Sequence, residues 1–320
     1  MMRLIPKFKG FDFFPHNTRI DFMRHWQACF WTSVATMVAC VILLFTMGLN
    51  YGVDFKGGTM LEVQTKSGAP ANIQSMRNQL SGLGVGDVQI QAFGASNDVL
   101  IRLEQQPGGE EEQQAAMKKV LGALGVDYVQ RRVEVVGPAV SAELRRTGFI
   151  AVVCAILAII AYVWFRFEWQ FAVGTIIALV HDVLVVVGIF SLFQLEFDLG
   201  IVAALLTILG YSVNDTVVIS DRIRENLRRY KRMELRELLN LSINETLSRT
   251  ILTGFTTIVV LMSLFIFGGS VLRYFTLAML MGVLIGTYSS IYIAAPILEI
   301  FGIKSETVTG SEKAAASARS

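Results

Sequence analysis

The residue with the most chemistry to offer is a carboxylate, Asp215, inside an apolar run from Leu199 to Ile219. An ionisable group at bilayer depth costs about 2.5–3.5 kcal/mol on insertion scales, and it faces a partner or an ion path rather than lipid. Thr207, Tyr211 and Asn214 precede it at i−8, i−4 and i−1, which predicts one polar stripe along a helix. We therefore expect Asp215 to bind a proton or an ion and to need a partner.

A candidate partner is Arg249, at the start of the fifth apolar run, whose helical face continues through Thr253, Thr256 and Thr257. Asp215 lies about one or two turns from the same end of the fourth run, so we expect the two side chains at similar depth. Protonation of the carboxyl would then break an ion pair and couple proton passage to helix movement. The alternative is that Arg249 is an ordinary interfacial arginine that extends to the headgroups.

His181 and Asp182 are neighbours near the middle of the third apolar run. A histidine beside a carboxylate suits a proton relay, and it equally suits a hydrogen bond between helices or support for Asp215. Asp182 and Asp215 also allow an aspartyl-protease pair that shares one proton. Neither aspartate follows a Gly-x-Gly sequence, and Arg249 would keep one carboxylate ionised, so the protease interpretation is disfavoured.

Other chemistry lacks sequence support. There is no His-Glu-x-x-His, P-loop or Gly-x-Ser-x-Gly sequence, which leaves an ATPase or a serine hydrolase unsupported. Cys29, Cys40 and Cys154 all lie in apolar runs without metal-type spacing. The net charge is only +2 and no nucleic-acid motif is present. We expect no enzyme activity, no cofactor, no metal site and no nucleic-acid partner.

The elements that carry these residues are membrane helices. Of 320 residues, 53% are hydrophobic and 17% are charged, against about 25% charged in soluble domains. Apolar runs long enough to cross about 30 Å of hydrocarbon are residues 28–49, 148–165, 170–193, 199–219, 250–267 and 274–297. The sequence therefore predicts an α-helical polytopic membrane protein with six transmembrane helices, in which Gly210, Gly282 and Gly286 allow close helix packing.

Loop charge predicts on which side each end lies. The segment 221–249 is rich in Lys and Arg, whereas residues 194–198 have none and residues 268–273 have one. By the positive-inside rule, this basic loop and both termini face the cytoplasm of a bacterial cell, and the chain is a multi-pass protein of its cytoplasmic (inner) membrane. We expect residues 1–27 to rest on membrane lipid headgroups and residues 298–320 to form a disordered tail.

Between the first two spans, residues 50–147 are polar and are expected to form an external domain, in the periplasm of a Gram-negative cell. Alternating and amphipathic stretches predict the order β-α-β-β-α-β, in residues 60–65, 71–80, 88–93, 99–103, 110–121 and 128–136. This order is typical of a small α+β ferredoxin-like domain. The chain enters it through residues 52–59, where Asp54, Gly57 and Gly58 predict a sharp exit from the membrane.

Several stretches together resemble a known family. Residues 52–59 are similar to its Gly-x-Asp-Phe-x-Gly-Gly-Thr signature. Further segments that fit in order and topology are Val136–Val140, Phe165–Trp169, Ala178–Asp182, Gly210–Thr216, Ser220–Asn226 and Phe267–Gly269. From about residue 50 to residue 296, the chain resembles the SecD/SecF family of protein-export membrane proteins, which are half-size members of the resistance-nodulation-division (RND) transporters.

The resemblance implies partners: SecD with another six spans, the SecY-SecE-SecG channel, YajC and YidC as further candidates, and an exported polypeptide. It also implies that the aspartate of the Asn214-Asp215 pair and the arginine Arg249 carry a proton pathway. We therefore expect a subunit that uses the proton-motive force to help polypeptides cross the membrane. An RND-type lipid or small-molecule transporter is the alternative, and the coupling ion, H⁺ or Na⁺, is left open.

Overall fold

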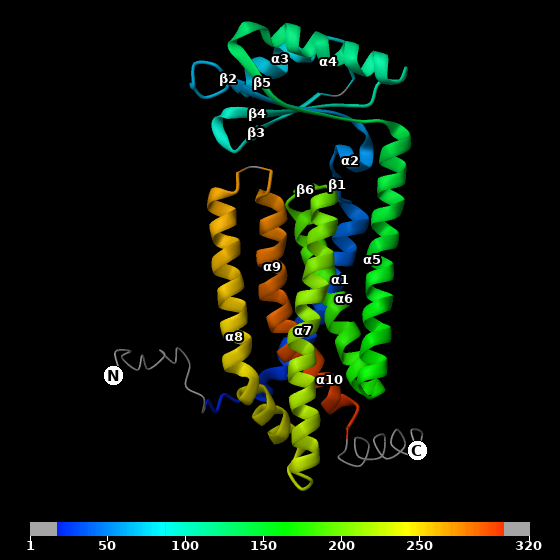
Figure 1. Cartoon of the computed structure of the whole chain (residues 1–320), viewed down its shortest axis with the longest axis vertical. Helices are drawn as coiled ribbons and strands as arrows, with labels where there is room; N and C mark the ends of the chain where they lie inside the picture. Colours follow the sequence, from blue (N-terminus) through cyan, green and yellow to red (C-terminus); the bar gives the residue numbers. More distant parts are fainter. Residues whose placement is uncertain (1–17, 87, 270, 304–320) are drawn as a thin grey trace, which may run out of the picture.

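The computed structural model describes residues 18–86, 88–269 and 271–303, and the predictions for residues 1–17 and for the tail beyond residue 303 lie outside this part. A bundle of long helices stands beneath one α+β domain (Figure 1). Within the described part, six helices are long and apolar enough to cross a membrane, which confirms the predicted number of spans. They are α1 (Trp26–Thr46, preceded by the 3₁₀ turn η1, Phe22–His25), α5 (Pro138–Arg166), α6 (Trp169–Leu192), α7 (Leu199–Arg229), α8 (Leu235–Phe267) and a sixth composed of α9 (Arg273–Ser289), the π-helical turn η3 (Ser290–Ala294) and α10 (Ala295–Ile300).

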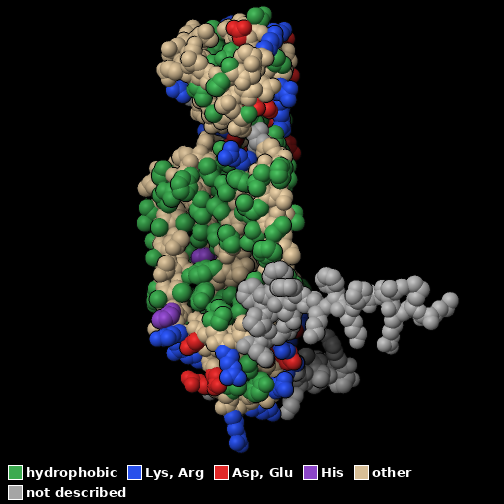
Figure 2. Space-filling model, turned by 90° about the vertical axis from the view of Figure 1, so that its left-hand side faces the viewer, with side chains coloured by type: hydrophobic (Ala, Val, Ile, Leu, Met, Phe, Trp, Pro, Cys, Tyr) green, Lys and Arg blue, Asp and Glu red, His purple; other side chains and the backbone are tan. Residues whose placement is uncertain are grey.

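Three spans form the centre of the bundle. In α6, α7 and the α9–α10 span, 56% of the most apolar window is buried, against 11%, 6% and 17% in the spans of α1, α5 and α8. On the face shown in Figure 2, hydrophobic side chains cover the length of the bundle, and charged side chains gather beyond its two ends. The outer helices therefore present apolar surface that suits lipid or another membrane chain.

Close packing of α9 on α7 depends on two glycines. A Cβ added to Gly282 would overlap the side chain of Ile208, and a Cβ on Gly286 would lie 3.1 Å from Ser212 Cβ. Gly210 is different, because nothing lies within 4 Å of its would-be Cβ and it is exposed on the outer face of α7. The prediction that Gly210 packs against another helix of this chain is therefore wrong.

We expect Gly282→Ala to lower the free energy of unfolding by about 1–3 kcal/mol, the usual cost of overpacking a well-filled interior. Gly210→Ala is the matched control, since its methyl group enters open space and alanine favours the helix. Thermal unfolding of the purified protein in detergent measures both. Equal melting temperatures for the two variants would contradict the packing seen here.

The segment expected as a basic loop is mostly helical. Helix α7 continues to Arg229 and α8 begins at Leu235, so the two form a long hairpin beyond the apolar belt. The extension is stabilised because the stripe Ile219, Ile223 and Leu227 is buried in one cluster with the first turns of α8. Charged residues thus lie on helix surfaces, where Arg222 Nε donates to Glu245 Oε2 at 2.8 Å.

The α+β domain has the predicted order of elements. Its strands and helices are β2 (Gly58–Thr65), α3 (Ile73–Leu80), β3 (Val88–Phe93), β4 (Ala95–Leu103), α4 (Glu110–Leu124, followed by the 3₁₀ turn η2, Gly125–Asp127) and β5 (Tyr128–Val136). The antiparallel sheet has the order β3-β4-β2-β5, with Leu61 opposite Ile101 on one side and Val133 on the other. Helices α3 and α4 cover one face of this sheet and the other face looks toward the bundle (Figure 1). This is the ferredoxin-like arrangement.

Candidate functional site

Asp215 lies on the face of α7 that packs against α8, and it is only 3% exposed. Its nearest electrostatic neighbours on α8 are Thr250 and Arg249. In the described part of the chain, Asp215 Oδ2, Thr250 Oγ1 and the Tyr211 hydroxyl are all buried and make no hydrogen bond of good geometry, although Thr250 lies close enough to interact with the Asp215 carboxyl group. Buried polar atoms are usually paired. Three buried oxygens without a well-aligned hydrogen bond therefore form a small polar site between two membrane helices, with room for a proton, a cation or water as a further partner.

The site continues along the two helices toward the external domain. Tyr211 is one turn from Asp215 on α7 and interacts with Thr257 of α8. Gly254 lies opposite, and a Cβ there would be 3.8 Å from the Tyr211 hydroxyl. Hydroxyl groups therefore follow the α7–α8 interface from Asp215 toward the α+β domain.

Arg249 does not touch Asp215 directly. Its side chain is exposed, and no ion pair within 4.0 Å joins the two residues in the described structure. The next residue, Thr250, is buried and occupies the position that faces the carboxylate. Arg249 is therefore close enough to act on the charge of Asp215 and remains on the outer side of α8.

Asp182 belongs to a second, fully hydrogen-bonded network. It is completely buried on α6, and its Oδ2 accepts hydrogen bonds from Ser212 Oγ of α7 at 2.6 Å and from Ser289 Oγ of α9 at 2.9 Å. His181 Nδ1 lies 3.1 Å from its Oδ1. Next to this network, Thr216 Oγ1 and Ser290 Oγ are 2.8 Å apart. The three central spans are thus joined at one level by polar groups around Asp182.

The predicted polar stripe on α7 is only partly present. Tyr211 lies beside Asp215, but Thr207 and Asn214 are exposed on the outside of the bundle. Ser212, which sequence reasoning left out, is the residue that links α7 to Asp182. The assignment of Asn214 to the inner face of this chain is therefore corrected, because its side chain points outward.

The two aspartates have different surroundings. Asp182 lies on α6, faces α7 and α9 and has three polar neighbours, whereas Asp215 lies on α7 and faces α8, where Thr250 is its nearest polar neighbour. No hydrogen bond between the two carboxyl groups is present among the described residues, so they do not share a proton as an aspartyl dyad does. Asp182 is therefore held by α7 and α9, and Asp215 belongs to the separate polar site between α7 and α8.

The membrane-exit residues connect the external domain to the same helix. Asp54 Oδ2 accepts a hydrogen bond of 3.0 Å from the backbone N–H of Leu199, the first residue of α7. Gly57 and Gly58 have φ of 76° and 117°, and a Cβ on Gly58 would collide with the Leu103 carbonyl. The sharp turn therefore requires glycine here, and it holds the carboxylate of Asp54 against the N-terminus of α7.

Six candidate spans, a buried carboxyl group between two of them and an α+β domain attached to the helix that carries it are together typical of a membrane transport protein. Residues 116–304 match the family model described as protein export membrane protein SecD/SecF, C-terminal, and residues 42–69 match the SecD/SecF GG motif. The chain belongs to the SecD/SecF family of protein-export membrane proteins.

Individual relatives agree over most of the chain. It is 46% identical over 298 residues to the protein translocase subunit SecF of Cereibacter sphaeroides, covering 90% of this chain and 91% of that one. Against SecF of Escherichia coli O157:H7, identity is 43% over 295 residues, with 91% of each chain covered.

Longer relatives contain a region like this chain. The chain covers 38% of the SecDF subunit of Brucella abortus, at 44% identity, with 91% of this chain covered. The crystal structure of SecDF from Thermus thermophilus superposes with a TM-score of 0.82 at 36% identity, covering 90% of this chain and 39% of that one. This chain therefore resembles somewhat more than a third of those longer proteins.

Proposed function

We propose that this chain is a subunit of the protein-export machinery that converts an ion gradient into movement of an exported polypeptide, together with a SecD-type partner. The observation that carries the proposal is the Asp215 carboxyl group, which is buried between α7 and α8 beside Thr250 and Tyr211 and whose Oδ2 makes no well-aligned hydrogen bond in the described part of the chain. The longer SecDF relatives support a partner of the SecD type, because in them a region like this chain is part of one longer polypeptide. The SecY-SecE-SecG channel, YajC and YidC remain candidate partners.

In the proposed cycle, an ion enters the α7–α8 interface and neutralises Asp215. The attraction between Asp215 and Arg249 then weakens, and α7 shifts relative to α8. Because Asp54 is hydrogen-bonded to the first residue of α7, the external domain moves with it. One charge crossing a potential of 100 mV supplies about 2.3 kcal/mol, which is enough to drive such a two-state change.

The proposal is tested with the chain and its SecD-type partner reconstituted into vesicles with the channel. Export is measured with a proton gradient, with a sodium gradient and with neither. Faster export under one gradient identifies the coupling ion, and equal export under all three conditions would overturn the proposal.

Arg249 offers a second test of the same cycle. We expect Arg249→Gln to lower gradient-dependent export on the order of tenfold, within the usual range of coupling between linked sites, whereas Arg249→Lys retains most of it. Arg232→Gln is the matched control, since Arg232 is exposed in the turn between α7 and α8 and its loss removes the same charge. If both Gln variants behave alike, Arg249 is only an interfacial arginine.

A further inference from the structure

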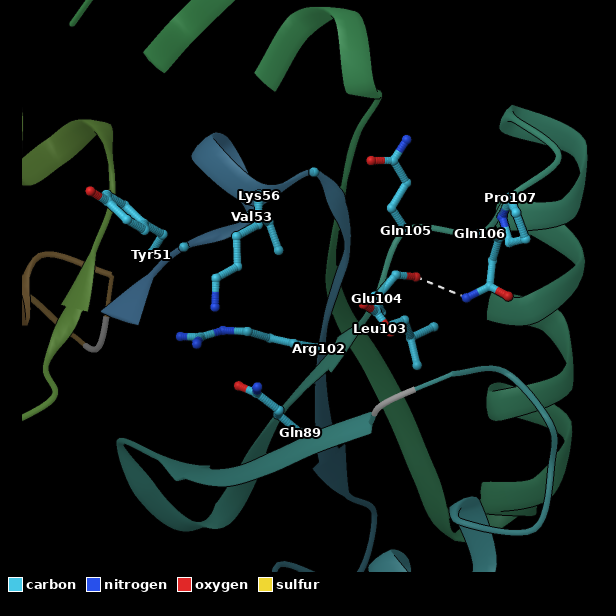
Figure 3. Close-up of a pocket in the computed structure, with 12 residues that line it drawn as sticks. Tyr51, Val53, Lys56, Gln89, Arg102, Leu103, Glu104, Gln105, Gln106 and Pro107 are labelled. Carbon is cyan, nitrogen blue, oxygen red and sulfur yellow. Dashed lines mark hydrogen bonds between the residues drawn. The ribbon is translucent and has the colours of Figure 1, made fainter. Parts of the chain in front are cut away.

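A buried ion pair joins the external domain to the membrane bundle. Arg102 of β4 pairs with Glu196 of β6 (Glu196–Phe197), the short strand in the connection between α6 and α7. Each residue is 8% exposed. The side chain of Arg102 leaves the sheet and points toward Tyr51 and Lys56 at the base of the domain (Figure 3). The pair therefore joins the α+β domain to the helix bundle, although its two residues are far apart in the sequence.

Other contacts converge on the same connection. Strand β1 (Asn50–Tyr51) pairs in parallel with β6, and the Gly52 N–H donates to the Phe197 carbonyl at 2.9 Å. A Cβ on Gly52 would lie 3.0 Å from Glu196 Oε1, so the exit segment passes directly beside the carboxylate. The chain that leaves the first span is thus held against residues 196–198, immediately before α7.

The Arg102–Glu196 pair is buried, and Arg102 also borders a pocket. Arg102 forms part of the wall of a pocket of about 550 Å³ between α2 (Val53–Lys56) and β4, together with Gln89, Gln105 and Gln106. Arg102 Nε is buried without a hydrogen-bond partner in the described part of the chain. The guanidinium therefore depends mainly on Glu196, and the pocket gives it room to move away without a collision.

We propose that Arg102 and Glu196 form a latch that transmits the movement of α7 to the external domain, an inference that rests on the proposed function. Glu196 is three residues before α7, and α7 carries Asp215 on the same continuous helix. A rigid helix moves its two ends together. When α7 shifts, Glu196 moves with it and carries Arg102, and hence the sheet of the external domain, along the same path.

Removing either partner should release the domain, because it leaves an unpaired buried charge, which costs far more than a missing surface ion pair. The distance between spin labels at Lys118→Cys on α4 and Val271→Cys on the α8–α9 turn reports the position of the domain. These measurements use the complex with its SecD-type partner in lipid nanodiscs, in a background whose three native cysteines are replaced. We expect Arg102→Gln and Glu196→Gln each to lose the single narrow distance and to lose gradient-driven export.

The exchanged pair, Arg102→Glu with Glu196→Arg, should restore both the narrow distance and export. Arg132→Gln is the matched control, since Arg132 pairs with Glu134 within β5 and makes no ion pair with the bundle among the described residues. Unchanged distances in both single variants would overturn the latch. Released domains with unimpaired export would overturn its role in transmission.

The pH dependence gives a sharper distinction between the two variants. Burial raises the pKa of Glu196, Arg102 opposes that rise, and Asp198 and Asp54 add to it. A carboxyl group whose pKa is raised in the docked position favours docking at low pH, and this contribution is lost as the pH rises through that pKa. Acidification should therefore restore the narrow distance in Arg102→Gln, where Glu196 becomes neutral, and not in Glu196→Gln. Failure of acid to do so would contradict the latch.

The test of the latch can succeed or fail independently of the test of the proposed function. Spin-label distances are measured without an ion gradient, so they test the latch even if export turns out not to depend on such a gradient. Conversely, normal export by Asp215→Asn would remove the proposed function and leave the distance result unchanged.

Discussion

Replacing Asp215 with asparagine is expected to abolish gradient-dependent export and to leave the amount of folded, assembled protein unchanged. Asparagine has nearly the same shape and cannot be ionised, so the site can no longer alternate between charged and neutral forms. Folding loses little, because Asp215 Oδ2 makes no hydrogen bond in the described part of the chain. The rate should fall to that of the wild type without a gradient, a loss of about fifty-fold for one charge moving across 100 mV.

Export in vesicles with and without a gradient measures this effect, and Asp215→Glu should retain part of the activity because it keeps a titratable group. Asp221→Asn is the matched control, since Asp221 is an aspartate of the same helix that forms an exposed ion pair with Arg166 at 2.9 Å. Normal gradient-dependent export by Asp215→Asn would show that the carboxyl group is not part of the coupling.

Local patterns were sufficient to predict the frame of the molecule. Spans appear in the sequence as long apolar runs because the bilayer imposes both length and hydrophobicity. The strands of the external domain appear as alternation, since one face of the sheet is covered by helices and the other is not. Both signals depend on residues near one another in the chain, so the number of spans and the order of elements follow from the sequence.

The surroundings of Asp215 were harder to predict, for a geometric reason. A helix turns about 100° per residue, so positions i−1 and i−8 lie about 100° and about 80° round from Asp215, whereas i−3 and i−4 lie about 60° and about 40° from it. Asn214 and Thr207 accordingly point outward, and Tyr211 and Ser212 point inward. The link from Ser212 to Asp182 depends on how α7 packs on α6, which counting along one helix does not give.

Contacts between segments far apart in the sequence leave no local pattern from which they could be predicted. Ser289 is 107 residues from Asp182 and comes next to it only when α9 packs on α6 and α7. Arg102 and Glu196 belong to different domains, and each looks like an ordinary surface residue in the sequence. The rotation of α8 in the bundle also decides that Thr250, and not Arg249, faces Asp215. These features required three-dimensional packing.

Substitutions of Asp182 should affect assembly rather than gradient-dependent export, the opposite of what is expected for Asp215. We expect Asp182→Ala to prevent stable assembly, because it strands the buried hydroxyls of Ser212 and Ser289 at about 1–3 kcal/mol each. Asp182→Asn keeps an oxygen that accepts from both serines, and its amide can donate to His181 Nδ1 in the appropriate tautomer. It should therefore assemble and export at close to the wild-type rate. Thermal unfolding and gradient-driven export, measured on the same preparations, give the two readouts.

The asparagine variants at the two positions separate a scaffold from a relay. A relay must lose and regain its proton, so Asp182→Asn would stop gradient-driven export and leave assembly intact if Asp182 passed protons to Asp215. The structure favours the scaffold, because the Asp182 carboxylate already has three polar neighbours on three different residues and Asp215 lies on the α8 side of α7. Loss of export in Asp182→Asn with normal assembly would reverse this assignment and make His181 and Asp182 part of the ion path.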